Sequence, residues 1–322
     1  MMQPLQGQIN LQEWGNNMSA TQAIVYYHAN CADGFGAAWA FHQLREDTYE
    51  HTQYIPSKYE VPPTLEYGLG KDINIYILDF SFAPDILVQM CQAVNQVILI
   101  DHHKTAIEML ENWPEVLPKN SNLYLKLDQT RSGAGLTWDF FTTKPRPALI
   151  NYIEDRDLWK FTLPDSKELN AVIANTEYDF ESWSSLQANL CYDYAGLCQV
   201  GEHLLAQHSR ICNQIIQDAR SITIEDSNRN KHTGLACNCT HQFASDVGNL
   251  LAIRSGTFGA CYFQNAKGDV KFSLRSNGDY DVSQLAKSYG GGGHKNAAGF
   301  TLCNAKEDGN ITIWQTGVEN VL

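Results

Sequence analysis

The chain has 322 residues, with 23 Lys and Arg against 36 Asp and Glu, which gives a formal charge of −13. Hydrophobic residues make up 43% of it, enough for one or two cores and too many for a chain that is disordered over most of its length. No apolar run approaches the roughly 20 residues of a membrane helix, so we expect no membrane span. The negative charge argues against binding of long nucleic acid, which needs clustered Lys and Arg.

Residues 1–22 are polar and rich in Gln and Asn, without a basic stretch followed by an apolar one. They predict a loose extension and a cytoplasmic protein. The 9 cysteines lack C-x-x-C spacing, which favours buried reduced thiols over disulfides or a zinc site. The whole acidic excess falls in residues 1–225, where it either serves solubility or holds divalent cations; composition does not decide between the two.

From residue 23 onward, short apolar runs alternate with longer helical patterns. Strands are expected over 23–28, 74–80 and 97–103, and helices over 34–46, 84–94, 132–141 and 147–159. This alternation predicts an α/β fold, with a parallel sheet covered by helices on both faces. In such a sheet the ligand site lies beyond the carboxyl ends of the strands.

The second half of the chain has a different pattern. Residues 23–178 form the first predicted domain, and a helical stretch over 179–224 predicts a linker. Residues 225–322 have short β-branched or aromatic runs separated by turns, with two helical segments between them. They predict a smaller α+β domain.

Side chains that bind metals follow three successive predicted strands and one predicted helix. They are His28, Cys31 and Asp33 in HANCADG, Asp79 in ILDFS, Asp101, His102 and His103 in IDHHK, and Asp155 and Asp157 in EDRDLW. Each of them alone is more often a helix cap or an ordinary polar residue. Gathered at one edge of a sheet, their carboxylates and imidazoles suit manganese, magnesium or zinc and suffice for two ions.

A glycine-rich motif, SYGGGGHKNAAGF, lies near the end of the second domain. Its Gly291, Gly292 and Gly293 precede His294 and what we expect to be a helix start. Glycines let the backbone approach an anion, and a helix N-terminus favours negative charge, so phosphate contact is preferred to a flexible linker. Arg275, in the predicted strand KFSLRS, either clamps a phosphate in the same pocket or is a solvated strand charge.

These motifs together resemble the DHH (Asp-His-His) phosphoesterases over about residues 23–315. The five that match, in the family's order, are HANCADG, ILDFS, IDHHK, EDRDLW and GGGGHKNAAG. The resemblance implies a Rossmann-like DHH domain at 23–178 and a DHH-associated, substrate-binding domain at 225–322. Similar proteins include nanoRNases, single-strand exonucleases, linear or cyclic dinucleotide phosphodiesterases, inorganic pyrophosphatases and polyphosphatases.

The resemblance also implies two divalent cations, with manganese the expected ion and magnesium, cobalt or zinc the alternatives. It implies that Asp79 bridges them, that His28 binds one, and that Asp33, His102 and Asp155 bind the other. We prefer Asp155 to Asp157 because a bulky aromatic residue follows it by four positions, as in the family pattern. By the same resemblance His103 faces the substrate phosphate, and Asp101 orients the neighbouring histidines.

One position departs from the family pattern. Cys31 stands where the first of two aspartates is usual, two residues before Asp33. As a thiolate it prefers zinc or iron, and as a neutral thiol it leaves one ion with fewer ligands. Both alternatives stay open.

The predicted function is hydrolysis of short oligonucleotides or linear dinucleotides to nucleoside monophosphates, as by a 3′–5′ oligoribonuclease. Asp79, Asp101 and His103 are assigned to catalysis, and Arg275, residues 291–293 and His294 to the substrate's far phosphate. The alternatives are a small-phosphate hydrolase, acting on pyrophosphate, polyphosphate or a nucleoside bisphosphate, and a non-catalytic nucleotide-binding module, which Cys31 motivates. The expected partner is the short substrate, with no long duplex nucleic acid and no membrane; a homodimer is left open.

Overall fold

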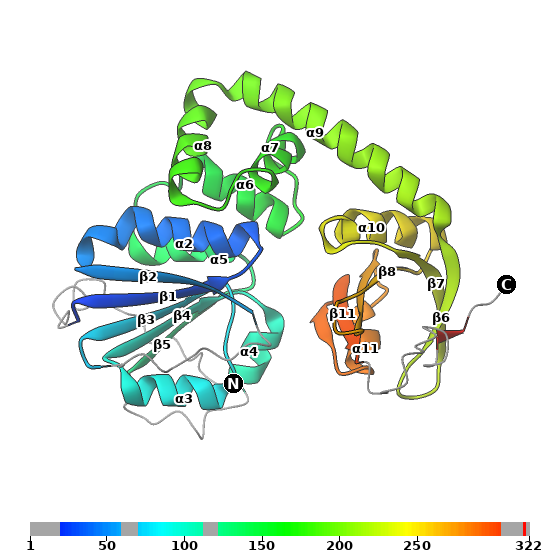
Figure 1. Ribbon diagram of the computed structural model, residues 1–322, viewed down its shortest axis with the longest axis horizontal. Coiled ribbons are helices and arrows are strands. Elements are labelled where there is room, and N and C mark those ends of the chain that lie inside the picture. The colour runs from blue at the N-terminus through cyan, green and yellow to red at the C-terminus, as the bar shows by residue number, and fades with distance from the viewer. Residues whose placement is uncertain (1–19, 59–69, 112–121, 304–317, 320–322) are drawn as a thin grey trace. The chain divides into compact units, whose positions relative to one another are not determined.

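The computed structural model describes residues 20–58, 70–111, 122–303 and 318–319 (Figure 1). The chain divides into two compact units, Met1–Leu205 and Ala206–Leu322. The predicted N-terminal extension falls mainly on residues 1–19, which lie outside the described residues. Among the helices of the described ranges, none combines the length and the apolar character that a membrane crossing requires.

The first unit contains a five-stranded sheet in the order β2-β1-β3-β4-β5, and all neighbouring strands are parallel. Its strands are β1 (Gln22–His28), β2 (His51–Ser57), β3 (Ile73–Leu78), β4 (Gln96–Asp101) and β5 (Leu123–Leu127). The three strands expected from apolar runs are β1, β3 and β4. The two edge strands, β2 and β5, are only partly buried, so their sequences lack a continuous apolar run. The predicted α/β class is confirmed.

Helices cover both faces of this sheet, as Figure 1 shows. On one face α2 (Ala32–Arg45) and α5 (Gly133–Phe141) share a core in which Phe41 packs near Leu136. On the other face α3 (Pro84–Ala93) and α4 (Lys104–Glu111) share a core that contains Leu87 and Leu110. Alternate side chains of the central strands enter the two cores, which explains why these strands are apolar on both sides.

A third core lies on the outer side of α2. It joins α2 to α6 (Ala148–Asp157), α7 (Ser166–Ala174) and α8 (Phe180–Tyr192) through Trp39, Ile153, Leu169 and Trp183. The predicted linker over 179–224 therefore contains α8, which packs in the core of the first unit. The long helix α9 (Tyr194–Ile215) follows it.

The second unit contains a seven-stranded sheet in the order β10-β11-β9-β8-β7-β6-β12. Its strands are β6 (Arg220–Glu225), β7 (Lys231–Asn238), β8 (Phe258–Gln264), β9 (Val270–Ser276), β10 (Gly292–His294), β11 (Ala297–Leu302) and β12 (Val318–Glu319). Neighbours are antiparallel except for β7 and β8, which are parallel. The helices α10 (Ala244–Ser255) and α11 (Val282–Lys287) complete the expected α+β arrangement.

The prediction of a helix after His294 is wrong. The glycine-rich motif instead forms the hairpin of β10 and β11. A Cβ atom on Gly291 would lie 2.1 Å from the carbonyl oxygen of Gly299, and one on Gly293, whose φ is +138°, would lie 2.5 Å from that of Ala297. The glycines therefore allow two strands to approach closely, and a helix dipole plays no part in the motif.

Candidate metal centre

The register of the first sheet brings three functional positions to one edge. Leu78, the last residue of β3, is paired with residues on both β1 and β4. The next residues along these three strands are His28, Asp79 and Asp101. They therefore lie side by side at the carboxyl end of the sheet, where parallel α/β sheets hold their ligands.

Asp79 lies at the centre of this edge and is only 1% exposed. Its φ of +64° is a left-handed conformation, which is costly for a residue other than glycine. Oδ1 lies 3.2 Å from Nε2 of His102 and Oδ2 lies 3.4 Å from Nδ1 of His28, yet neither oxygen has a hydrogen-bond partner among the described residues. Burial acts to raise the pKa of Asp79, but these two histidines outweigh it and hold the pKa well below its usual range. A buried ionised carboxylate without donors is the arrangement that a bound cation satisfies.

Three groups of candidate ligand atoms surround Asp79 and His102, and within each group the atoms lie within 4.8 Å of one another. The groups are His28, Cys31 and Asp79; Asp79, His102 and His103; and Asp33, His102 and Asp157. Because neighbouring groups share a residue, they form one continuous cluster of candidate ligands, in which Asp79 belongs to two groups and His102 to two. Carboxylate and imidazole donors suit manganese, magnesium or zinc, with one thiol as the exception.

The structure brings Asp157, and not Asp155, to this centre. Oδ2 of Asp157 lies 3.6 Å from Nε2 of His102. The Asp155 carboxylate is directed elsewhere: it accepts hydrogen bonds from the amide and hydroxyl groups of Thr162, at 2.9 and 2.8 Å, and from the amide of Leu163 at 3.2 Å. Asp155 thus fastens the turn after α6, and the preference for it as a metal ligand is corrected in favour of Asp157.

Asp33 is held by the beginning of α5. Its two carboxylate oxygens accept hydrogen bonds from the amides of Gly133, at 2.6 Å, and Ala134, at 2.9 Å. Amides at a helix N-terminus favour a negative charge. A Cβ atom on Gly133 would lie 2.6 Å from Cβ and Oδ1 of Asp79, so only glycine fits there. Sequence reasoning predicted the helix but missed this role, for which the small residues of SGAG were the available signal.

The cluster concentrates negative charge. Burial, reinforced by the neighbouring carboxylates of Asp79 and Asp157, raises the pKa of Asp33 well above its usual value, and burial raises the pKa of Asp157 to about 6. Burial acts to lower the pKa of His102, but Asp79 and Asp33 outweigh it and raise that pKa to about 10. Burial and the same two carboxylates raise the pKa of the Cys31 thiol. The centre therefore attracts positive charge, as a cation site does.

In the second unit, the predicted phosphate-binding residues lie in one row of the sheet. His294 is paired with Ala297, and Ala297 with Arg275 on the next strand. Paired residues of neighbouring strands point to the same face, so His294 and Arg275 share a face. The Arg275 guanidinium donates to Oγ of Ser245 at 2.8 Å and to the carbonyl of Leu274 at 2.9 Å, and within the described residues it has no carboxylate partner. Burial lowers the pKa of Arg275 although Asp246 opposes the effect, so its place on the sheet is what makes it a phosphate candidate.

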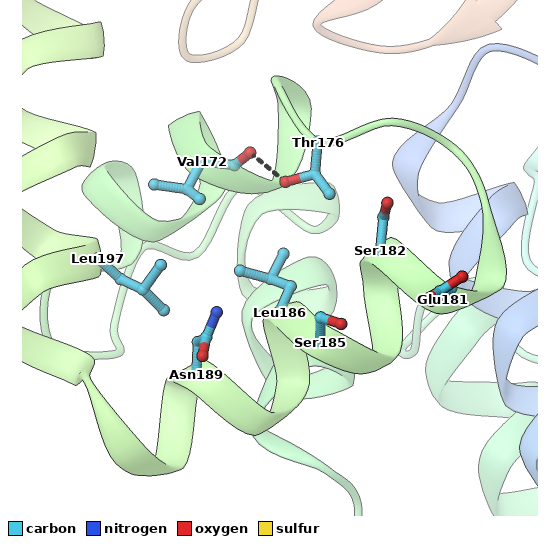
Figure 2. Close-up of a pocket in the computed structure, with 8 residues that line it drawn as sticks. All are labelled: Val172, Thr176, Glu181, Ser182, Ser185, Leu186, Asn189 and Leu197. Atoms are coloured by element: carbon cyan, nitrogen blue, oxygen red, sulfur yellow. Dashed lines mark hydrogen bonds between the residues drawn. The ribbon is translucent and has the colours of Figure 1, made fainter.

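A cavity of about 410 Å³ lies between α7, α8 and the start of α9 (Figure 2). Its walls include Val172, Leu186 and Leu197, and its one ionisable residue is Glu181. None of the residues in the three ligand groups lines it. This cavity is therefore separate from the metal centre.

Comparison with known proteins assigns the family. Residues 242–312 match the model of the DHHA1 domain. An uncharacterized protein of Acanthamoeba polyphaga mimivirus is 32% identical over 299 residues, which cover 88% of this chain and 68% of the relative. The chain belongs to the DHH family.

One solved structure shows the same overall fold. An exopolyphosphatase-related protein from Bacteroides fragilis superimposes with a TM-score of 0.54 at 17% identity, covering 96% of this chain and 94% of its own. The manganese complex of RecJ from Thermus thermophilus has a TM-score of 0.48 at 13% identity, covering 91% of this chain and 51% of its own. The first of these likenesses concerns the fold, and the substrate follows from neither.

Proposed function

We propose that this DHH protein hydrolyses short oligonucleotides or linear dinucleotides to nucleoside monophosphates, as a 3′–5′ oligoribonuclease does. The observation that carries the proposal is the Asp79 carboxylate, which is buried, has no hydrogen-bond partner of good geometry within the described residues, and belongs to two of the three ligand groups. His28, Cys31 and Asp79 would hold one divalent cation, and Asp33, Asp79, His102 and Asp157 the other, with manganese the expected ion. Two such cations supply Lewis acidity that activates water and neutralises phosphate charge.

We assign His103 as the proton donor to the leaving group. Its Nδ1 donates to Oδ1 of Asp101 at 2.8 Å, which fixes the ring orientation. Burial acts to lower the pKa of His103, but Asp101 and Asp79 outweigh it and raise the pKa, which favours the ring protonated on both nitrogens. The proton at Nε2 is then available to the oxygen that leaves phosphorus.

The second unit has phosphate-binding candidates of its own. Arg275 and His294, on one face of its sheet, are suited to bind a phosphate. The charge of −13 and the carboxylates of the first unit repel a long polyanion, whereas one or two phosphates are compensated locally. This charge distribution favours short substrates over long ones.

The test uses the purified full chain with RNA and DNA of two to seven nucleotides, linear and cyclic dinucleotides, and pyrophosphate. Each is incubated with manganese, magnesium, cobalt or zinc, and products are separated by chromatography. We expect nucleoside monophosphates from the short substrates, loss of activity in EDTA and recovery on adding manganese. Asp79→Asn should lower the rate at least 100-fold, whereas Asp85→Asn, at an exposed position that belongs to none of the three ligand groups, should not.

Two results would contradict the proposal. Hydrolysis of pyrophosphate without cleavage of, or competition by, dinucleotides would identify a small-phosphate hydrolase. Binding of nucleotides without hydrolysis in any of the four metals would identify a non-catalytic module.

A further inference from the structure

The first amides of α5 donate to carboxylates from two other helices. An α-helix leaves its first four amides without partners inside the helix, and in α5 these belong to residues 132–135. Asp33 and the Ser132 hydroxyl accept three of them, those of Gly133, Ala134 and Gly135. The fourth, the amide of Ser132, donates to Oε2 of Glu154 at 3.1 Å. Glu154 therefore completes the set of acceptors that includes the metal-ligand candidate Asp33.

Glu154 joins the two helices that place one of the ligand groups. It belongs to α6 and stands three residues before Asp157. Residues three apart on a helix are neighbours on its surface, so the two carboxylates lie on the same side of α6. The hydrogen bond from Ser132 to Glu154 thus connects the helix that carries Asp157 to the helix whose amides hold Asp33. Asp33 and Asp157 belong to one ligand group, with His102.

The Glu154 carboxylate packs closely against α5. A Cβ atom on Gly135 would lie 2.4 Å from Oε2 of Glu154 and 2.9 Å from Nη1 of Arg146. Any larger residue at this position would push the carboxylate or the guanidinium away from the helix. The small residues at the start of α5 therefore admit Glu154 on one side, as they admit Asp79 on the other.

Arg146 holds the Glu154 carboxylate in place. Its guanidinium lies 2.9 Å from Oε2 of Glu154 and donates two hydrogen bonds to the carboxylate of Asp139, at 2.8 and 2.5 Å. Asp139 lies near the end of α5, so Arg146 is anchored to the same helix that Glu154 contacts. The side chains of Arg146 and Glu154 are only 16% and 15% exposed. A two-point guanidinium contact in a partly buried setting keeps a defined geometry, unlike an isolated surface ion pair.

We propose that Glu154 is a positioning residue of the metal centre, which acts on Asp33 through Ser132 and the start of α5. It sets the spacing of the Asp33 and Asp157 carboxylates, and with it the affinity for the cation that these two residues and His102 would hold. Removal of a group that holds a metal ligand in place typically lowers metal affinity by about 10- to 100-fold. The inference goes beyond the proposed function, because cation binding does not depend on which phosphoester is cleaved.

The first experiment titrates the metal-free full chain with manganese by calorimetry. Glu154→Ala removes the acceptor of the Ser132 amide and a partner of Arg146, so we expect one manganese ion to bind at least about tenfold more weakly. The ion at His28 and Cys31 should bind as in the wild type. Glu154→Gln keeps a side-chain oxygen for the amide and should bind both ions nearly as tightly as the wild type does.

The matched control is Asn170→Ala. Asn170 is 2% exposed on α7, and its side-chain amide donates to the carbonyls of Tyr152, on α6, and Ser166, at 2.9 and 2.8 Å. Its removal loosens the contact of α6 with α7 and leaves the contact with α5 intact. We therefore expect a lower melting temperature and unchanged manganese binding. Equal losses of manganese affinity in Glu154→Ala and Asn170→Ala would show a general loosening of α6 and overturn the positioning role.

A second variant, Glu154→Asp, covers the case that Glu154→Ala does not fold. It retains the charge that pairs with Arg146, but its side chain is one methylene shorter and its carboxylate is drawn back from the Ser132 amide. The same manganese ion should bind more weakly. Wild-type affinity for both ions, in a protein that thermal unfolding shows to be folded, would overturn the proposal. The titrations contain no substrate, so an absence of hydrolysis would contradict the proposed function alone.

Discussion

Oδ1 of Asp101 accepts a hydrogen bond from Nδ1 of His103 at 2.8 Å. The same oxygen accepts the backbone amides of His102, at 2.7 Å, and His103, at 3.1 Å. Asp101 is fully buried at the end of β4, so one carboxylate sets both the path of the chain through the two histidines and the orientation of the His103 ring. This is how carboxylates behind a metal site usually act.

Asp101→Asn is expected to lower kcat about 10- to 100-fold. The amide keeps an oxygen for the two backbone N–H groups, but it is neutral and no longer favours the protonated His103 ring. KM and metal content should stay near wild type, which steady-state kinetics and elemental analysis would check. A parallel loss of bound metal would instead make Asp101 a ligand.

Substitution of Asp155 should lower stability, whereas substitution of Asp157 should lower activity. Asp155→Ala leaves the amides of Thr162 and Leu163 without their acceptor, which we expect to cost about 1–3 kcal/mol of unfolding free energy. Activity per folded molecule should be retained. Asp157→Ala should have the opposite effect, with loss of metal binding and hydrolysis and little change in the melting temperature. Loss of metal from Asp155→Ala at full stability would reverse the assignment.

The same pair shows where sequence reasoning reached its limit. Residues two apart on a helix point about 200° apart, so choosing between them requires knowing which face of α6 is turned toward the metal centre. That face is set by packing of Ile153 against α2, α7 and α8, a contact between distant parts of the chain. By contrast, His28, Asp79 and Asp101 were predictable together, because each directly follows or ends an apolar strand and parallel strands end at one edge.

Other elements that the sequence did not predict also depend on contacts between distant parts of the chain. The partly buried edge strands β2 and β5 become recognisable only beside β1 and β4. The glycine-rich motif gives no helix because Gly291 must lie against Gly299, which the local sequence does not reveal.

Gly133→Ala tests how closely α5 approaches the metal centre. The new methyl group would lie 2.6 Å from Cβ and Oδ1 of Asp79, so the carboxylate or the helix must move. We expect metal affinity to fall at least tenfold in a calorimetric titration. The control is Gly278→Ala, whose φ of +63° carries a backbone cost but whose Cβ meets nothing within 4 Å. That variant should be slightly less stable and bind metal normally; unchanged metal affinity in Gly133→Ala would refute the close contact.

Acid should destabilise the segment before α5, because it protonates Asp128, which accepts hydrogen bonds from Thr130 and Arg131. Burial acts to raise the pKa of this carboxyl, but hydrogen bonds from Thr130 and Arg131 outweigh it and lower the pKa from 3.8 to about 2. A depressed carboxyl pKa stabilises the fold above the unfolded value, and the contribution is lost as pH falls from about 4 to 2. With partial exposure, Asp128→Asn should cost about 1–2 kcal/mol at pH 7. Urea midpoints of wild type and variant should converge near pH 2; a constant difference would exclude this linkage.

Cys31→Asp should change which ions the first ligand group prefers. Burial, Asp79 and Asp33 raise the pKa of the Cys31 thiol, so before a cation binds it is neutral and a poor ligand for hard ions. An aspartate adds a carboxylate oxygen next to His28 and Asp79, and we expect manganese and magnesium to bind about tenfold more tightly. Zinc, which a thiolate favours, should lose its advantage.

Two variants serve as controls for this change. Cys31→Ser keeps a small neutral side chain, so its manganese affinity should match the wild type while its zinc affinity falls. Cys191→Asp adds the same negative charge at an exposed position and should change neither. Calorimetric titration of each protein with the two metals measures the affinities, and manganese-dependent hydrolysis should rise with manganese affinity. If Cys31→Asp and Cys31→Ser both bind the two metals as the wild type does, Cys31 is not a ligand, and one ion is held by His28 and Asp79 without it.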